Sequence, residues 1–184
     1  PGPGLAIRVL CHPLLFEEGE GGGVVDAMGL TSKPPLPLLA KEGINCRVLP
    51  IRSVGVQGDN RTYAHPLVVW GEEDWKKLDA FSSQITNTNR EINRVLLWLN
   101  PQQDKIIGQL QTACLTPKRV ELLRHIDALV NKEIIAAKLS GAIWQFPVVL
   151  IPFGAGEKES IVLRPIISEE AMTAHFARLP KNLL

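Results

Sequence analysis

The stretch Leu49-Pro50-Ile51-Arg52-Ser53-Val54-Gly55-Val56-Gln57-Gly58-Asp59-Asn60-Arg61-Thr62-Tyr63 decides the predicted fold of this chain. Apolar residues alternate with polar or small ones through its first half, which is the period of a half-buried strand. Gly55 and Gly58 bracket its polar end, and glycine permits close approaches that a Cβ blocks. The stretch therefore predicts a strand and a turn that presents Asp59 and Arg61. Such a turn is either plain hairpin chemistry or part of a binding site, and both interpretations stay open.

The segments that follow continue the pattern of a small sheet covered by a helix. We expect a strand from about residue 46 to 55, a second strand at 63–70, a helix at 74–89 and a closing strand at 94–99. In the helix, apolar residues recur at a spacing that places them on one core-facing side. These residues are Trp75, Leu78, Phe81 and Ile85.

A second helix is predicted to begin at Thr116 and Pro117, because threonine is a good N-cap and proline suits the first helical position. Gly141 stands where a C-cap glycine is expected. The apolar stripe of this helix consists of Val120, Leu123, Ile126, Leu129 or Val130, and Ile134.

The last third of the chain predicts strands at 146–152 and 160–167, joined by a glycine-rich turn at 154–156. A helix is expected to follow, with Ser168 as its cap and glutamates near its positive end. Arg164 is interpreted as a solvated edge charge, with a phosphate contact as the alternative.

The order strand, turn, strand, helix thus occurs at 48–89 and again at 148–179, which indicates a tandem duplication. The predicted fold class is α+β, with two tandem ββαβ-like units, each a small sheet with a helix packed on one face. Residues 1–115 would form the first subdomain, with an insertion at about 11–43. Residues 116–184 would form the second, truncated at its C-terminus.

Composition narrows the classes of function. The 184 residues carry a formal net charge of +1 and are 45% hydrophobic, as in an ordinary globular chain. We therefore expect neither nucleic acid nor membrane as a partner. Cys11, Cys46 and Cys114 are odd in number and widely spaced, which favours a reducing compartment and a cytoplasmic, cytosolic location. Because the first residue is Pro1, we expect a piece of a longer protein.

Three further patterns carry weaker signals. The four histidines lack the HExxH spacing, so no metal site and no histidine base is predicted. The glycine cluster at 17–23 contains glutamates that would repel phosphate, which favours a loop over a phosphate cradle. The proline-rich segment 33–37 is interpreted as a connector, with a ligand for an aromatic groove as the alternative.

Three motifs together resemble one family. Residues 1–9 read PGPGLAIRV, residues 54–59 read VGVQGD and residues 172–180 read MTAHFARLP. In this order they are similar to the C-terminal region of glutamine-hydrolysing GMP synthase, in a long form with a duplicated subdomain. The resemblance covers the chain except for about 11–43.

The resemblance implies a ligase reaction in which xanthosine monophosphate (XMP) is aminated to GMP. ATP adenylates the xanthine C2 oxygen, and ammonia from glutamine displaces AMP. The Cys-His-Glu set of the glutaminase domain and the motif of the ATP-pyrophosphatase domain are absent from this sequence. We therefore expect those domains to be partners in the same protein, no catalytic residue here and no turnover by the fragment alone. ATP and Mg²⁺ would serve the full-length enzyme, and none is expected to bind this fragment.

The resemblance also assigns four residues to XMP. The backbone of Gly2 would approach the xanthine ring, Asp59 would accept ribose hydroxyls, and Arg61 would be a phosphate or structural partner. Gln145 precedes a Phe-Pro-Val-Val-Leu run, and its amide suits either a purine edge or a phosphate. The structural alternatives are an Asp59–Arg61 ion pair within the turn and Gln145 as a strand cap.

Three classes of function stay open under this resemblance. The first is a substrate-binding and assembly domain, which binds XMP or GMP together with its neighbouring domains. The second is a non-catalytic dimerisation or interaction module with no direct ligand contact. The third is an independent nucleotide-binding regulator. Short-form members pair as homodimers through one such unit, and a covalent second copy would cover the same surface.

Overall fold

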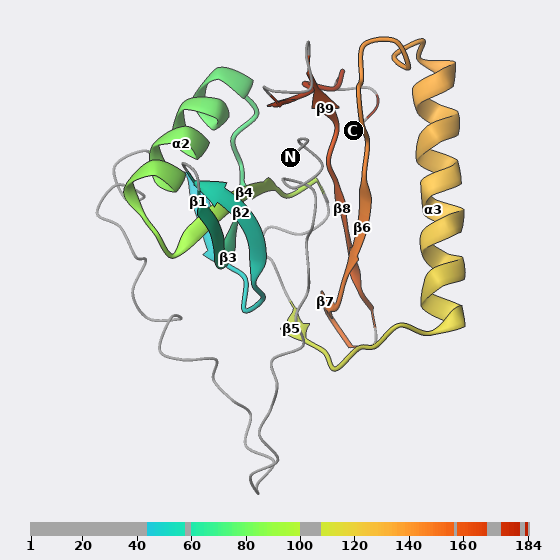
Figure 1. The fold of residues 1–184 in the computed structure, drawn as a ribbon, viewed down its shortest axis with the longest axis horizontal. Helices are drawn as coiled ribbons and strands as arrows, with labels where there is room; N and C mark the ends of the chain where they lie inside the picture. Colours follow the sequence, from blue (N-terminus) through green and yellow to red (C-terminus); the bar gives the residue numbers. More distant parts are fainter. Residues whose placement is uncertain are drawn as a thin grey trace, which may run out of the picture. The chain divides into compact units, whose positions relative to one another are not determined.

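The computed structural model describes residues 44–57, 60–99, 108–156, 158–168, 174–180 and 183. The described chain falls into an N-terminal unit, residues 44–99, and a C-terminal unit, residues 108–183. The assignment of subdomains to 1–115 and 116–184 includes residues outside this description and stays a prediction. Both units combine a helix with small, mostly antiparallel sheets, so the predicted α+β class is confirmed (Figure 1).

The N-terminal unit is a four-stranded sheet organised around β3 (Asn60–Trp70). This strand pairs antiparallel with β1 (Asn45–Val48) and β2 (Ser53–Gln57), and parallel with β4 (Ile92–Leu97). The predicted succession of strand, turn and strand is confirmed, but β2 extends to Gln57 and β3 begins at Asn60, so Arg61 lies in a strand and not in the turn.

The single strand expected from 46 to 55 is wrong, because β1 and β2 are separate strands. Pro50 has no N–H to give to a ladder, and the chain bends at residues 50 and 51. The Nδ1 atom of His65 lies 2.7 Å from the Ile51 carbonyl oxygen and 3.1 Å from that of Leu49. Both partners are acceptors, so Nδ1 carries the proton and donates to them. The ring thus holds the bend against β3.

Helix α2 (Trp75–Thr88) covers this sheet as the sequence predicts. Asp74 caps it by accepting a hydrogen bond from the Lys76 N–H at 2.8 Å. Leu78, Phe81 and Ile85 are buried, and Trp75 packs on the edge of the same core. Sheet residues of the core include Leu67, Val69 and Ile92.

A β-bulge interrupts the pairing of β3 with β4. His65 opposes Ile92, but the next residue, Pro66, opposes Arg94, which leaves Asn93 as an extra residue. The bulge shifts the alternation of the strand by one. Ile92 therefore lies in the core, and Val95, three residues on rather than two, packs against the same core.

The C-terminal unit contains the long helix α3 (Pro117–Ala136), which packs on β6 (Val148–Ile151). Strand β6 pairs antiparallel with β8 (Ser160–Leu163). Two shorter antiparallel pairs are β5 (Gln109–Leu110) with β7 (Phe153–Gly154), and β9 (Ile166–Ile167) with β10 (His175–Phe176).

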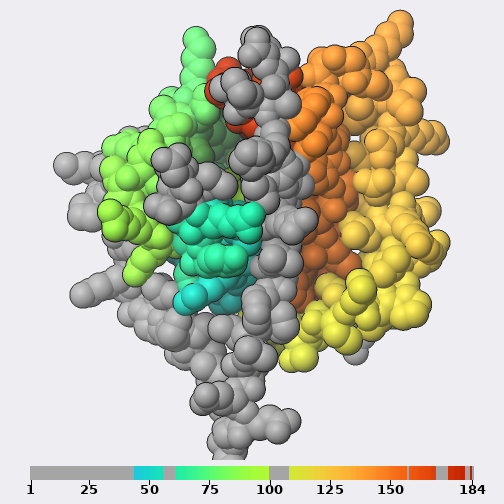
Figure 2. All heavy atoms as spheres, viewed as in Figure 1, coloured from blue at the N-terminus to red at the C-terminus, as the bar shows by residue number. Residues whose placement is uncertain are grey.

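Helix α3 begins as predicted, with Thr116 accepting from the Arg119 N–H and proline in the first turn. Most of its surface is exposed (Figure 2). Ile134 is buried, whereas Leu129 is 52% exposed, so the apolar stripe continues through the half-buried Val130 instead.

The helix expected after Ser168 is wrong for residues 174–180, and residues 169–173 lie outside the description. His175 and Phe176 form β10. The Ala177 N–H donates to the Pro165 carbonyl, and not to a carbonyl four residues before it as in a helix. Ala177 and Leu179 are buried while Arg178 between them is exposed, which is the period of an extended chain. The helix seen in the described part of this unit is therefore α3, which lies between β5 and β6, so the described residues do not repeat the element order of the first unit.

The C-terminus of α3 differs from the expected glycine cap. Ala137 is the C-cap, and Lys138 follows with a φ of 59°. The Lys138 N–H donates to Ile135 and the Leu139 N–H donates to Ile134, both at 3.0 Å. This is a Schellman motif in which lysine occupies the position that glycine prefers. Gly141 lies beyond the turn, where a Cβ would point into open space.

Replacement of Lys138 by glycine is expected to raise the free energy of unfolding by about 1 kcal/mol, because glycine adopts positive φ without a Cβ clash. Urea unfolding of the 184-residue chain measures the change. Lys132→Gly, at an exposed site inside α3, is the control and is expected to lower stability by about 1 kcal/mol. A loss of stability at both positions would contradict the prediction.

Candidate functional site

The four residues assigned to XMP are distributed over different parts of the chain. Gly2 and Asp59 lie outside the described residues. Arg61 lies in β3 of the N-terminal unit and is exposed, whereas Gln145 lies in the C-terminal unit and is half-buried. The site is therefore described as two surfaces, one on each unit.

The first surface is the β2–β3 hairpin. Its last described pair is Gln57 with Asn60, so Gly58 and Asp59 are the two residues that connect the strands. Arg61 opposes Val56 in the next pair and is exposed to solvent. An exposed guanidinium beside a hairpin loop can meet an anionic ligand. The alternative ion pair with Asp59 involves a residue outside the description and stays a prediction.

Two polar residues of β4 hold this hairpin at its base. The Asn93 Nδ2 group donates to the Ser53 carbonyl at 2.7 Å and to the Thr62 carbonyl at 3.2 Å. Its Oδ1 accepts from the Ser53 hydroxyl at 2.6 Å. The Arg94 Nη2 group donates to the Val54 carbonyl at 2.7 Å. Burial lowers the pKa of Arg94, but a guanidinium stays charged, so a cation is anchored under the hairpin.

The role of this pair was not predicted from the sequence. Its signal is the Ile92-Asn93-Arg94-Val95 order, in which two consecutive polar residues separate two residues of the core. A spacing of three between core residues requires one extra residue, which is what a bulge supplies.

The second surface surrounds Gln145. Its backbone forms an antiparallel bridge with Ile166, and the Gln145 Oε1 atom is buried with no hydrogen-bond partner among the described residues. The same register brings Pro147 opposite Arg164, whose N–H donates to the Pro147 carbonyl at 3.1 Å. Directly opposed residues share a face, so Gln145 and Arg164 lie on one face of the ladder.

Other buried polar atoms belong to this region. The Arg164 Nη1 and Ser168 Oγ atoms are both buried. A fully solvated Arg164 is therefore wrong. Because Oε1 is a buried acceptor that bonds to none of the described groups, the strand-cap interpretation of Gln145 has no support in these residues. An amide, a guanidinium and a hydroxyl together suit a ligand with several polar groups.

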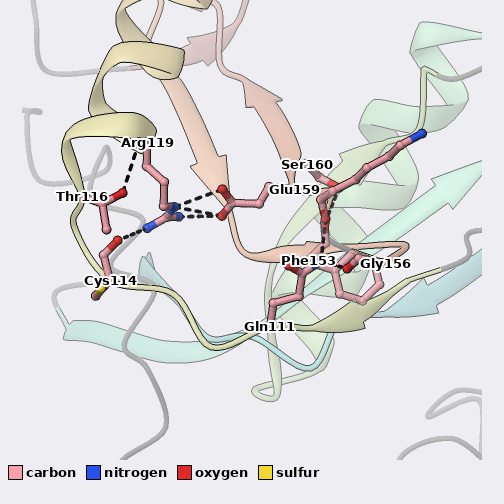
Figure 3. A network of polar contacts seen from close by, with 9 residues as sticks. Gln111, Cys114, Thr116, Arg119, Phe153, Gly156, Glu159 and Ser160 are labelled. Atoms are coloured by element: carbon pink, nitrogen blue, oxygen red, sulfur yellow. Dashed lines mark hydrogen bonds and ion pairs between the residues drawn. The ribbon is translucent and has the colours of Figure 1, made fainter.

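A separate polar network fastens α3 to the β7–β8 turn (Figure 3). Both carboxylate oxygens of Glu159 accept from the Arg119 Nε at 3.0 Å, and one of them pairs with its Nη2 at 2.7 Å. The Gln111 Nε2 donates to the Gly156 and Lys158 carbonyls, each at 2.6 Å. The dashed bonds join side chains to one another and to backbone carbonyls, so this network is structural.

The turn in this network also restricts its sequence. The Gly154 backbone lies so close to the Lys158 carbonyl oxygen that a Cβ at residue 154 would collide with it. Gly156 has a φ of 60°, which glycine adopts at little cost.

Neither surface has the ligands of a metal site. Within the described ranges, no group of three or more His, Cys, Asp or Glu side chains is placed to hold a metal ion. Neither α2 nor α3 is long and apolar enough to cross a membrane.

Proteins of known name share sequence with this chain. No family model matches the chain. A protein of Leptospira interrogans serovar copenhageni named "Probable GMP synthase [glutamine-hydrolyzing]" is 40% identical over 187 residues, covering 100% of this chain and 29% of the relative. One of the same name from Caenorhabditis elegans is 31% identical over 249 residues, with 100% and 33% coverage. GMP synthase of Mycobacterium tuberculosis is 42% identical over 89 residues, 44% of this chain and 16% of the relative.

By its fold, this chain is an α+β region with one polar surface on each of its two units. Over its whole length the chain is similar to proteins named glutamine-hydrolysing GMP synthase, and the predicted family resemblance is confirmed. It spans 29% of the length of the Leptospira relative, a share consistent with the predicted C-terminal region.

Glu159→Gln is expected to lower the free energy of unfolding by about 2 kcal/mol, because a partly buried guanidinium loses its carboxylate. The side chains of Arg119 and Glu159 are 23% and 15% exposed. Glu121→Gln is the control, since its ion pair with Arg124 spans 3.4 Å between side chains that are 75% and 73% exposed. The control is expected to cost less than about 0.5 kcal/mol. Equal losses in urea unfolding would refute the difference.

Proposed function

We propose that this chain is the substrate-binding and assembly region of a GMP synthase, a ligase that aminates XMP to GMP with ATP and glutamine-derived ammonia. The relationship to proteins of that name over the whole chain supports the family. The single structural observation that supports ligand binding is the buried Gln145 Oε1, which lacks a partner among the described residues. A buried acceptor left unbonded is costly, and a ligand donor would remove that cost.

Each assigned residue has a role that its chemistry permits. Gln145 would give its amide to the purine edge or the phosphate, with Arg164 on the same face as a neighbouring cation. Asp59 would accept the ribose hydroxyls, Arg61 would meet the phosphate, and the Gly2 backbone would approach the ring. All of these contacts bind and orient the nucleotide, and none performs the chemical step.

The proposed reaction needs ATP and Mg²⁺, which we assign to the ATP-pyrophosphatase domain of the same protein. The described residues contain no carboxylate cluster that would hold the metal. Together with the glutaminase domain, that domain is the proposed partner of this region. Affinity for XMP is then assembled from several domains, so the isolated chain would bind it weakly and turn nothing over.

A second candidate function is a non-catalytic dimerisation or interaction module, located in the cytosol like the first. Exposed apolar side chains on α3, such as Leu122 and Leu129, favour it, because such residues are common at protein contacts. In that case the polar surfaces would not contact XMP.

Steady-state kinetics of the full-length protein distinguishes the two functions. Gln145→Ala and Asp59→Asn are each expected to raise the KM for XMP about tenfold and to leave the KM for ATP unchanged, because each removes a contact to one substrate only. Gln84→Ala, at an exposed position of α2, is the matched control and is expected to change neither constant.

An unchanged KM for XMP in both variants would contradict the substrate-binding function. If the same variants also altered sedimentation of the protein, the interaction module would be favoured instead.

A further inference from the structure

The bulge in β4 places Asn93 where a regular strand would not. In the ladder with β3, Ile92 and Arg94 have opposing residues and Asn93 has none. Bulges redirect a side chain, and they are frequent next to functional sites. Ile92 meets the hydrophobic core, so Asn93 is not needed for core packing.

The redirected amide binds both strands of the hairpin. Ser53 belongs to β2 and Thr62 to β3, and Asn93 bonds to the backbone of each. The Ser53 hydroxyl returns a third bond to the same side chain, and Ser53 is 1% exposed. A two-stranded ribbon is marginally stable by itself, so a fixed attachment at its base determines how its two strands are oriented.

The hairpin has a space that fits this side chain. A Cβ added to Gly55 would lie 2.9 Å from the Asn93 Cβ and 3.0 Å from its Nδ2. Gly55 opposes Thr62 in the hairpin register, so the amide lies against that pair. Because Gly55 has no Cβ, the Asn93 side chain can lie this close to the hairpin.

We infer that Asn93 is a positioning residue, which orients the β2–β3 hairpin so that Arg61 of β3 meets the nucleotide. The inference rests on the proposed function, because it assigns the task of placing Arg61 to a side chain that touches neither ligand nor reacting atoms. Arg94 supports the same strand from the next position through its bond to the Val54 carbonyl.

The test uses the full-length protein and the substitution Asn93→Asp. The two side chains have nearly the same volume, but a carboxylate oxygen would replace Nδ2 and face the carbonyl oxygens of Ser53 and Thr62. We expect the KM for XMP to rise about tenfold while the KM for ATP stays constant. Asn87→Asp, at an exposed site in α2, introduces the same charge and is expected to have no effect.

A double-mutant cycle separates positioning from general destabilisation. If Asn93 acts through Arg61, its substitution changes the KM for XMP less than about twofold once Arg61→Ala is present. Full additivity of the two effects would overturn the inference. Gly55→Ala, which displaces the same amide without changing it, is expected to raise the KM in the same direction, and it serves if Asn93→Asp does not fold.

The outcome of this test is distinguishable from failure of the proposed function. Gln145→Ala reports on the other unit and does not involve the hairpin. If Gln145→Ala and Asp59→Asn raise the KM for XMP while Asn93→Asp and Gly55→Ala leave it unchanged, the positioning role alone is overturned. If all four leave it unchanged, the proposed function fails and the inference fails with it.

Discussion

The pairing of β3 with every other strand of the N-terminal unit is the constraint on which that unit depends. Three strands pair with this one strand, β2 with its first half and β1 and β4 with its second half, so their registers cannot change independently. His65, which holds the bend at residues 50 and 51, and the bulge at Asn93 occur where these registers meet. His65 holds the chain segment between β1 and β2. The bulge directs Asn93 to the hairpin, while Ile92 before it packs in the core.

The C-terminal unit is stabilised differently, by hydrogen bonds from side chains to the connection between its strands. Arg119 and Gln111 hold the β7–β8 connection, and α3 contributes mainly one packed face. Its polar surface lies along the ladder from Gln145 to Ser168, where buried groups stand close in register. The two units thus offer chemically different surfaces, one with an exposed guanidinium and one with a buried amide.

Local patterns in the sequence predicted much of this fold. The sequence predicted the succession of strand, turn and strand that β2 and β3 form, helical spacing predicted the buried face of α2, and Thr116 with Pro117 predicted the start of α3. Features that depend on distant partners were not predictable. Residues 174–180 carry a helix-like pattern, but β9 and the Pro165 carbonyl provide extended partners that local propensity cannot include. For the site, the sequence could select Arg61 and Gln145 as candidates by residue type. It could not predict the hydrogen bonds of Asn93, because their partners lie 31 and 40 positions away.

The contact between Gly154 and Lys158 has a consequence for how this region can vary among relatives. The clash is with a main-chain oxygen, which no rotamer change can move aside. A homologue with any larger residue at that place would have to insert residues between β7 and β8 to widen the connection. Length variation in this short loop and loss of its first glycine should therefore occur together during divergence.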